Sequence, residues 1–174
     1  MIEILILYLI NKRELTMYGI QKSVADYFAP LTKPSFGVIN PALRRLEKSG
    51  CINTRRSLSE GGKQSAYYSI TNEGIKTLNK LILENLSENP VQFFSNARIK
   101  IACADVLSKD EVAELFLKLK TRALEHKFDA ENILNDEYTS LTFYQRIVLE
   151  NTVEEINNLI LLIENLEKEN AGNS

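Results

Sequence analysis

The sequence predicts a mainly helical protein with one small β-hairpin, because turn-forming residues are concentrated in its first half. Six of the seven glycines and three of the four prolines lie within the first 74 residues, so short elements and tight turns are expected there. The remainder has little to interrupt long helices. We therefore expect two domains, residues 1–86 and 87–174, in a chain of 174 residues that is long enough for each to bury a core.

Charge divides the chain at nearly the same place. The formal net charge is −2, yet residues 1–80 hold 12 Lys and Arg against 6 Asp and Glu, a balance of +6. Residues 81–174 hold 9 against 17, a balance of −8. A basic half joined to an acidic half indicates two roles, one of which involves a polyanion.

The first residues form an apolar segment. Residues 2–12 are expected to form a buried helix, because the apolar run is shorter than the ~20 residues that span a bilayer. The run also lacks the basic region and cleavage site of a signal peptide. Because the run is too short to span a bilayer, we expect no membrane partner. Cys51 and Cys103 lie far apart and outside any C-x-x-C motif, which favours reduced thiols and a cytoplasmic location.

A second helix is predicted over about 18–28. Ile20, Val24 and Phe28 recur every four residues and define one apolar face. Thr16 is a candidate N-cap, because a threonine hydroxyl can accept a hydrogen bond from a free backbone N–H of the first turn.

The third element, residues 35–48, is the most informative. Apolar residues at spacings of three and four form one helical face, and the opposite face is cationic and carries an amide. A helix that enters the major groove of DNA needs such a face. Pro41 leaves two alternatives: it lies inside one long helix, or Asn40 caps a helix that begins at Pro41.

A hairpin and a further helix follow. Gly50 is placed to end the third helix, and the β-forming segments 51–57 and 65–70 flank a glycine-centred turn with a basic tip. Thr71 then caps a helix that runs towards Leu86. Three helices, a hairpin and a helix are the order of a winged helix-turn-helix. Helix, wing and charge together favour DNA binding, although for Arg44 alone an ordinary solvated face is an equal alternative.

Residues 16–21, 34–50, 59–63 and 67–74 together resemble the PadR family of bacterial transcriptional regulators. The resemblance implies a homodimer that binds a near-palindromic operator through the recognition helix 35–48 and the wing 58–64, usually as a repressor. The sequence departs from the family at one position, where an aromatic residue is common and this chain has Asn40. By resemblance, the DNA-binding residues are Tyr18 and Gln21 near the backbone, Ser35, Asn40 and Arg44 at the groove, and Lys63 and Gln64 on the wing.

The second half is expected to form an all-helical dimerisation domain. Residues 91–107 are expected to form a mostly apolar helix. Residues 108–111 fit a capping box, and further helices are expected over about 109–135 and 141–166. The apolar stripe of the last helix is wider than a coiled-coil seam and must be covered by the preceding helix, by a second copy, or by both. Proteins that bind two half-sites on DNA are usually two-fold dimers, so DNA binding favours a dimer here. Its predicted interface residues are Tyr144, Val148, Ile156, Leu159, Ile163 and Leu166.

No enzyme signature is recognisable in the sequence. The single histidine, His126, is expected on a helix surface rather than as a base or a metal ligand, and no phosphate-binding or nucleophile motif occurs. We therefore expect no catalytic activity, no cofactor and no metal site.

Two further hypotheses remain. The resemblance implies small-molecule effectors, such as phenolic acids or drugs, for some family members. Without tryptophan, stacking would use Tyr or Phe, although Phe93, Phe94 and Phe116 are more simply interpreted as core. The alternative function is a winged-helix module that has lost direct DNA binding and recruits a protein partner through its C-terminal helices.

Overall fold

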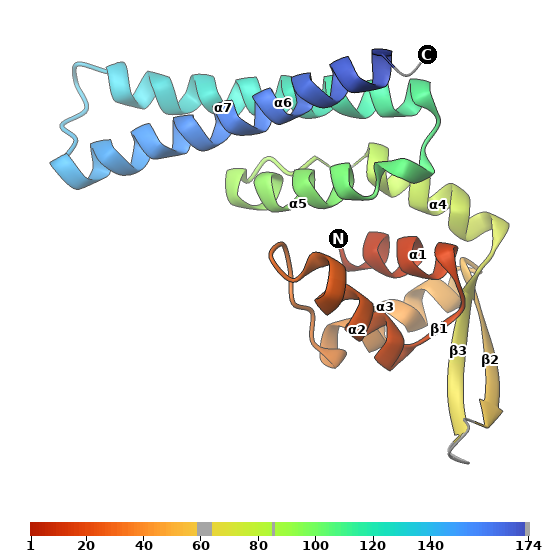
Figure 1. The fold of residues 1–174 in the computed structure, drawn as a ribbon. Helices are drawn as coiled ribbons and strands as arrows, with labels where there is room; N and C mark the ends of the chain where they lie inside the picture. Colours follow the sequence, from red (N-terminus) through yellow and green to blue (C-terminus); the bar gives the residue numbers. More distant parts are fainter. Residues whose placement is uncertain (59–63, 85, 173–174) are drawn as a thin grey trace. The chain divides into compact units, whose positions relative to one another are not determined.

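The computed structural model describes residues 1–58, 64–84 and 86–172, with side chains described through residue 170. Within these residues the fold is mainly helical with a small antiparallel sheet, which confirms the predicted fold class. The described chain divides into two compact units, Met1–Leu107 and Ser108–Ser174 (Figure 1). The first unit begins with these elements: α1 (Ile2–Lys12), β1 (Leu15–Thr16), α2 (Met17–Phe28), α3 (Phe36–Lys48), β2 (Ile52–Leu58), β3 (Gln64–Ile70) and α4 (Asn72–Leu83).

The boundary between the units lies later than residue 86, where the sequence analysis places it. The helix α5 (Pro90–Ala102) and the 3-10 helix η1 (Ala104–Val106) both belong to the first unit. A buried cation explains this, because Lys100 of α5 is 1% exposed and caps the C-terminus of α4. Its ammonium donates hydrogen bonds to three carbonyl oxygens, those of Leu81, Ile82 and Glu84.

The core of the first unit is built around α1. Consecutive residues Ile4, Leu5, Ile6 and Leu7 are all buried, so this helix is covered on every side. It packs against α2, α3, α4 and β3. The predicted helix over residues 2–12 is confirmed, and it provides the support on which the other elements rest.

The sheet contains one more strand than the predicted hairpin. Among the described residues its order is β1-β3-β2, with Leu15 opposite Tyr68 and Thr16 opposite Tyr67. The hydroxyl of Thr16 accepts a hydrogen bond from the N–H of Gly19, so the predicted cap of α2 is confirmed. One residue therefore ends a strand and begins a helix.

The helix α3 begins at Phe36, so Pro41 lies inside it and Asn40 is not its N-cap. Gly50 ends the helix with φ 72°, a conformation that favours glycine. The N–H of Gly50 donates to the carbonyl of Glu47, and the N–H of Cys51 donates to that of Leu46. This pair of hydrogen bonds is a Schellman motif, and it directs the chain into β2.

A close backbone approach fixes the start of α4. Thr71 caps the helix, as predicted, by accepting a hydrogen bond from the N–H of Gly74. A Cβ at Gly74 would lie 2.1 Å from the carbonyl oxygen of Cys51, so only glycine fits here. The helix ends at Leu83, before the predicted end near Leu86.

The second unit consists of α6 (Lys109–Asn135) and α7 (Phe143–Gly172), which run side by side in Figure 1. The predicted capping box is present, because Ser108 and Glu111 satisfy each other's backbone N–H groups. The prediction that His126 lies on the surface is wrong, since this residue is 8% exposed. Its spacing from Leu119 and Ala123 places it on the buried stripe of α6.

No helix in the described part of the chain is both long and apolar enough to cross a membrane.

Candidate nucleic-acid interface

Three predicted DNA-binding residues line one surface hollow. Tyr18 and Gln21 from α2 and Ser35 at the start of α3 border a cavity of about 470 Å³. Lys22 and Lys33 line the same cavity, and both are exposed. The sequence analysis missed both lysines, although the spacing of four between Tyr18 and Lys22 already placed these two residues on one helical face.

The start of α3 adds a favourable field to this hollow. A helix N-terminus leaves its first N–H groups without intrahelical partners and carries a partial positive charge. Ser35 occupies the N-cap position, and its side chain makes no capping hydrogen bond. A hollow with a helix N-terminus, two lysines and a tyrosine is suited to a phosphate group.

The outer face of α3 is cationic and open to solvent. Asn40, Arg44 and Lys48 follow one another at spacings of four and are all exposed. Ile39, Leu43 and Leu46 on the opposite face are buried, and a fourth buried residue there is Ala42. The apolar face therefore fixes the helix to the core and leaves the polar face free for a partner.

The adjacent arginines of α3 have different partners. The Nε of Arg45 lies 2.8 Å from a carboxylate oxygen of Glu3, which ties α3 to the start of α1. Arg44 forms no ion pair with a carboxylate among the described residues. The charge of Arg45 is thus compensated within the protein, while that of Arg44 faces solvent.

The adjacent arginines of the wing show the same division. Arg55 donates to Glu14 at 2.5 Å and lies over the ring of Tyr67, 5.0 Å from its centroid. The hydrogen bond that Arg55 donates to the carboxylate of Glu14 raises the pKa of Arg55. Arg56, on the other face of β2, forms no ion pair within the described part of the chain.

The wing face that carries Arg56 adjoins α3. The register places Arg56 opposite Ala66, and Thr54 opposite Tyr68, so these side chains share one face of the hairpin. The pKa of Tyr68 is raised, chiefly by its burial and then by Glu47, whereas Arg44 and Arg56 oppose the rise. Arg44 and Arg56 are therefore both within electrostatic reach of one tyrosine, although the sequence places them on different elements.

Of the two predicted wing residues, Gln64 lies within the described part of the chain and Lys63 does not. Gln64 pairs with Leu58 at the end of the hairpin and lies on the same face as Arg56. Lys63 lies outside the described residues, as does the rest of the turn. Among the predicted wing contacts, only Gln64 is therefore located.

The predicted dimer residues fall into two groups. Tyr144 and Val148 near the start of α7 are 80% and 64% exposed. Ile156, Leu159 and Ile163 are buried within a single chain, and Leu166 is partly buried. The packing of α7 on α6 thus covers the middle of the predicted stripe without a second copy.

The charge asymmetry follows the structural units. Residues 1–107 contain 14 Lys and Arg against 9 Asp and Glu, a balance of +5. Residues 108–174 contain 7 against 14, a balance of −7. Among the described residues, no group of three His, Cys, Asp or Glu side chains could hold a metal ion.

Comparisons with known proteins identify a family of similar sequences. The model of the transcriptional regulator PadR-like family matches residues 6–80. A PadR family transcription regulator from Clostridium difficile R20291 is 32% identical over 45% of this chain and 80% of its own, with a TM-score of 0.41. A comparison with curated protein sequences gives no significant match.

Longer but more distant similarities extend over nearly the whole chain. Bacillus subtilis PadR, solved in complex with operator DNA, is 18% identical over 97% of this chain and 98% of its own, with a TM-score of 0.45. The same protein solved with p-coumaric acid gives the same identity and coverage and a TM-score of 0.40. On the family match and the identity to the clostridial regulator, the chain belongs to the PadR-like family of transcriptional regulators.

Proposed function

We propose that this protein is a cytoplasmic repressor that binds a near-palindromic operator as a homodimer. The observation that carries the proposal is the open cationic surface formed by α3 and the wing. Arg44 and Arg56 lie there without a carboxylate partner among the described residues, whereas their neighbours Arg45 and Arg55 are ion-paired. A surface of uncompensated cations attracts DNA through release of the phosphates' counterions.

In the proposed complex, the outer face of α3 enters the major groove. Asn40 reads base edges, because its amide can donate to and accept from the same adenine. Arg44 contacts a guanine edge or a nearby phosphate. The hollow formed by Tyr18, Gln21 and Ser35 takes a backbone phosphate, and the wing residues Lys63 and Gln64 contact the adjacent backbone.

The homodimer is supported by apolar side chains that one chain leaves in water. In α6, Leu117, Leu124 and Phe128 are 62%, 50% and 64% exposed, and helical spacing places them on the side opposite the buried stripe. Exposed contiguous apolar surface of this kind usually marks an interface. Tyr144 and Val148 extend the proposed interface to α7, while Ile156, Leu159 and Ile163 hold α7 to α6.

The acidic second unit supports the same division of roles. Its balance of −7 is repelled by phosphate, so DNA is directed to the basic unit. A two-fold dimer presents two copies of that unit to two half-sites, which is why a near-palindromic operator is proposed.

Selection of oligonucleotides from a random pool tests sequence-specific binding directly. We expect an inverted-repeat sequence to be enriched, with an affinity that falls steeply as salt rises. Arg44→Ala should weaken binding about tenfold, whereas the control Arg146→Ala in the acidic unit should not. If random duplex DNA gives no retardation even at low salt, the protein-recruiting module becomes the better assignment.

Transcription in vitro from a promoter that contains the selected sequence tests repression. Added protein should lower transcript yield, and Arg44→Ala should restore it. A rise in transcript yield would show activation instead.

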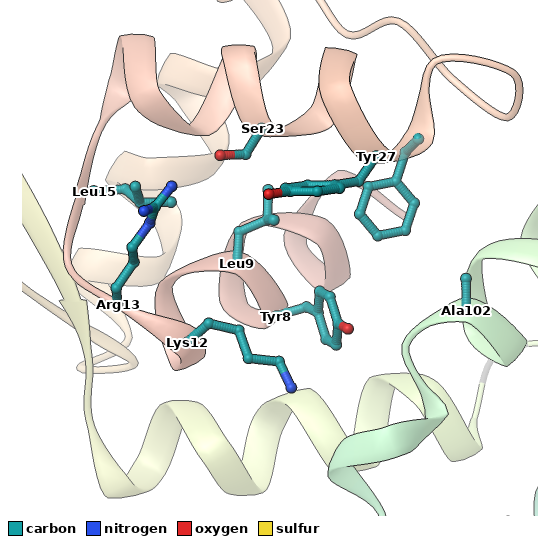
Figure 2. A pocket seen from close by; sticks show the side chains of 9 residues that line it. Tyr8, Leu9, Lys12, Arg13, Leu15, Ser23, Tyr27 and Ala102 are labelled. Carbon is teal, nitrogen blue, oxygen red and sulfur yellow. The ribbon is translucent and has the colours of Figure 1, made fainter.

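Control by a small molecule is part of the proposal. Bacillus subtilis PadR has been solved in complex with p-coumaric acid, and the present chain offers a cavity in its first unit that the DNA surface does not use (Figure 2).

A further inference from the structure

Three exposed residues in the first half of α3 are unfavourable for a helix. Gly37, Val38 and Pro41 all lie within α3 and are open to solvent, and Val38 is 49% exposed. In a helix, glycine loses more backbone entropy than alanine, a β-branched valine loses side-chain freedom, and proline removes a backbone hydrogen bond. We call these three residues the apolar patch of α3.

Packing within the first unit does not explain the apolar patch. A Cβ at Gly37 would meet only the Oγ of Ser35, at 3.5 Å, which is ordinary van der Waals contact. Gly37 also has no positive φ that would require a glycine. The face that fixes α3 to the core consists of other residues, which are Ile39, Ala42, Leu43 and Leu46. Sequences usually depart from local folding preferences where function requires it, so the patch is better explained by a partner.

The apolar patch adjoins the polar groups that are proposed to contact DNA. Pro41 is three residues from Val38 and four from Gly37, so the three residues are neighbours on the helix surface. Asn40 is three residues beyond Gly37, and Arg44 is three beyond Pro41. The patch and the two polar side chains therefore form one continuous outer surface of α3.

The major groove of DNA offers one apolar group to such a surface. The edges of adenine, guanine and cytosine present hydrogen-bond donors and acceptors there, whereas thymine adds a methyl group at C5. A small apolar side chain is a suitable contact for this methyl group. Gly37 has no side chain and Pro41 a short ring, so neither holds the backbone of α3 away from the base edges.

We propose that the apolar patch of α3 recognises a thymine in each half-site, with the side chain of Val38 against the 5-methyl group. This inference rests on the proposed function, because it requires α3 to enter the major groove. Val38 is then a specificity-determining residue, and Gly37 and Pro41 permit the close approach. Apolar contact thus adds to the hydrogen bonds proposed for Asn40 and Arg44.

Replacement of thymine by uracil tests the methyl contact directly. Each thymine of the selected operator is replaced in both half-sites, which removes one methyl group and leaves the hydrogen-bonding edge unchanged. Fluorescence anisotropy with the full chain should show one position at which the replacement weakens binding about fourfold per half-site, as expected for burial of one methyl group. If no replacement weakens binding by at least about twofold, the proposal is wrong.

The variant Val38→Ala assigns the contact to its residue. This variant should bind the thymine and uracil operators with equal affinity, because the group that touches the methyl has been removed. The matched control Val91→Ala changes an 80% exposed valine of α5 and should keep the wild-type ratio of affinities. Arg44→Ala should weaken binding to both operators and also keep that ratio. A full loss on uracil replacement in Val38→Ala would overturn the assignment.

Thermal melts separate this role from a role in folding. Alanine is a better helix former than valine or glycine, so Val38→Ala and Gly37→Ala should raise the melting temperature by about 1–2 °C while they weaken operator binding. For Gly37→Ala we expect a loss of at least about threefold, because the new methyl group lies in the closest contact. A lower melting temperature for Val38→Ala would assign Val38 to the core, and unchanged operator affinity for Gly37→Ala would exclude the close approach.

The selection of oligonucleotides distinguishes a failure of this inference from a failure of the proposed function. A chain that selects an operator and is insensitive to the thymine methyl contradicts the role of Val38 alone. A chain that selects no operator contradicts both proposals.

Discussion

The two units differ in how completely they bury their apolar side chains. In Met1–Leu107, α1 is enclosed by other elements and the buried core is extensive. In Ser108–Ser174, α6 carries one apolar stripe that α7 covers and another that remains exposed. A unit built from short elements can surround its own core, whereas α6 and α7 each present more faces than the other can cover. The first unit therefore encloses its own core, whereas the second leaves an apolar stripe of α6 exposed.

Replacement of Gly74 should lower the free energy of unfolding more than any other change proposed below, because the first unit depends on its own packing. In Gly74→Ala the new Cβ meets the Cys51 carbonyl oxygen at 2.1 Å, so we expect a loss of about 3 kcal/mol in unfolding free energy, or failure to fold. Urea denaturation followed by circular dichroism measures it. The control Gly37→Ala has only Ser35 Oγ within reach, at 3.5 Å, and should change stability by less than about 1 kcal/mol.

Charge in the exposed stripe of α6 should act on assembly rather than on folding. The double substitution Leu124→Glu with Phe128→Glu places carboxylates where a second copy is proposed to bind, so sedimentation velocity should show a monomer. Helical content should be retained, because both side chains are exposed. Val91→Glu, which changes an 80% exposed residue of the first unit, should leave the dimer intact. A wild-type monomer at all concentrations would remove the contrast between the units.

The wing arginines allow a finer test within the first unit. Arg56→Ala should lower operator affinity about fivefold and reduce the salt slope by about one, as expected for one lost phosphate contact. Arg55→Ala should leave the salt slope unchanged and lower stability, because this guanidinium is already paired with Glu14. The comparison of slopes by fluorescence anisotropy separates a DNA contact from an internal clamp. Equal slopes for the two variants would argue against this assignment.

Alkaline pH should produce the smallest change in stability, and this change should arise in the first unit. Burial raises the pKa of Tyr8 from 10.0 to about 12 and that of Cys103 from 9.0 to about 12. Between these values the folded protein holds protons that the unfolded chain releases, so stability falls as pH rises from about 9 towards 12. Tyr8→Phe with Cys103→Ala should flatten this decline in thermal melts. An equally steep decline in the double variant would place its origin elsewhere.

Local patterns in the sequence predicted most of the winged-helix region. Thr16, Gly50 and Thr71 each act on the backbone within a few residues, and the structure confirms all three roles. The strand β1 was not predicted, because it spans Leu15–Thr16 and is defined by its pairing with distant Tyr67 and Tyr68. The burial of His126 was missed because its charged neighbours concealed the helical spacing.

At the candidate interface too, residue spacing did not predict the contacts between residues that are distant along the chain. Spacing along α3 indicated that Arg44 lies on the polar face, but it did not show that the neighbouring charge of Arg45 is compensated by Glu3. Sequence also could not place the end of the first unit, since that depends on Lys100 reaching the carbonyls at the end of α4. Each of these facts joins residues that are distant along the chain.

The sequence by itself determined the order of the helices and the hairpin, the basic and acidic halves and the polar face of α3. These follow from interactions within a turn or two of the chain, where residue type and spacing are sufficient. The tertiary structure alone decided which arginines are already neutralised, which part of the predicted stripe α6 covers, and that Tyr18 and Lys33 border one hollow. Those outcomes depend on long-range packing, which brings together side chains from separate elements and sets which charges and apolar faces remain for a partner.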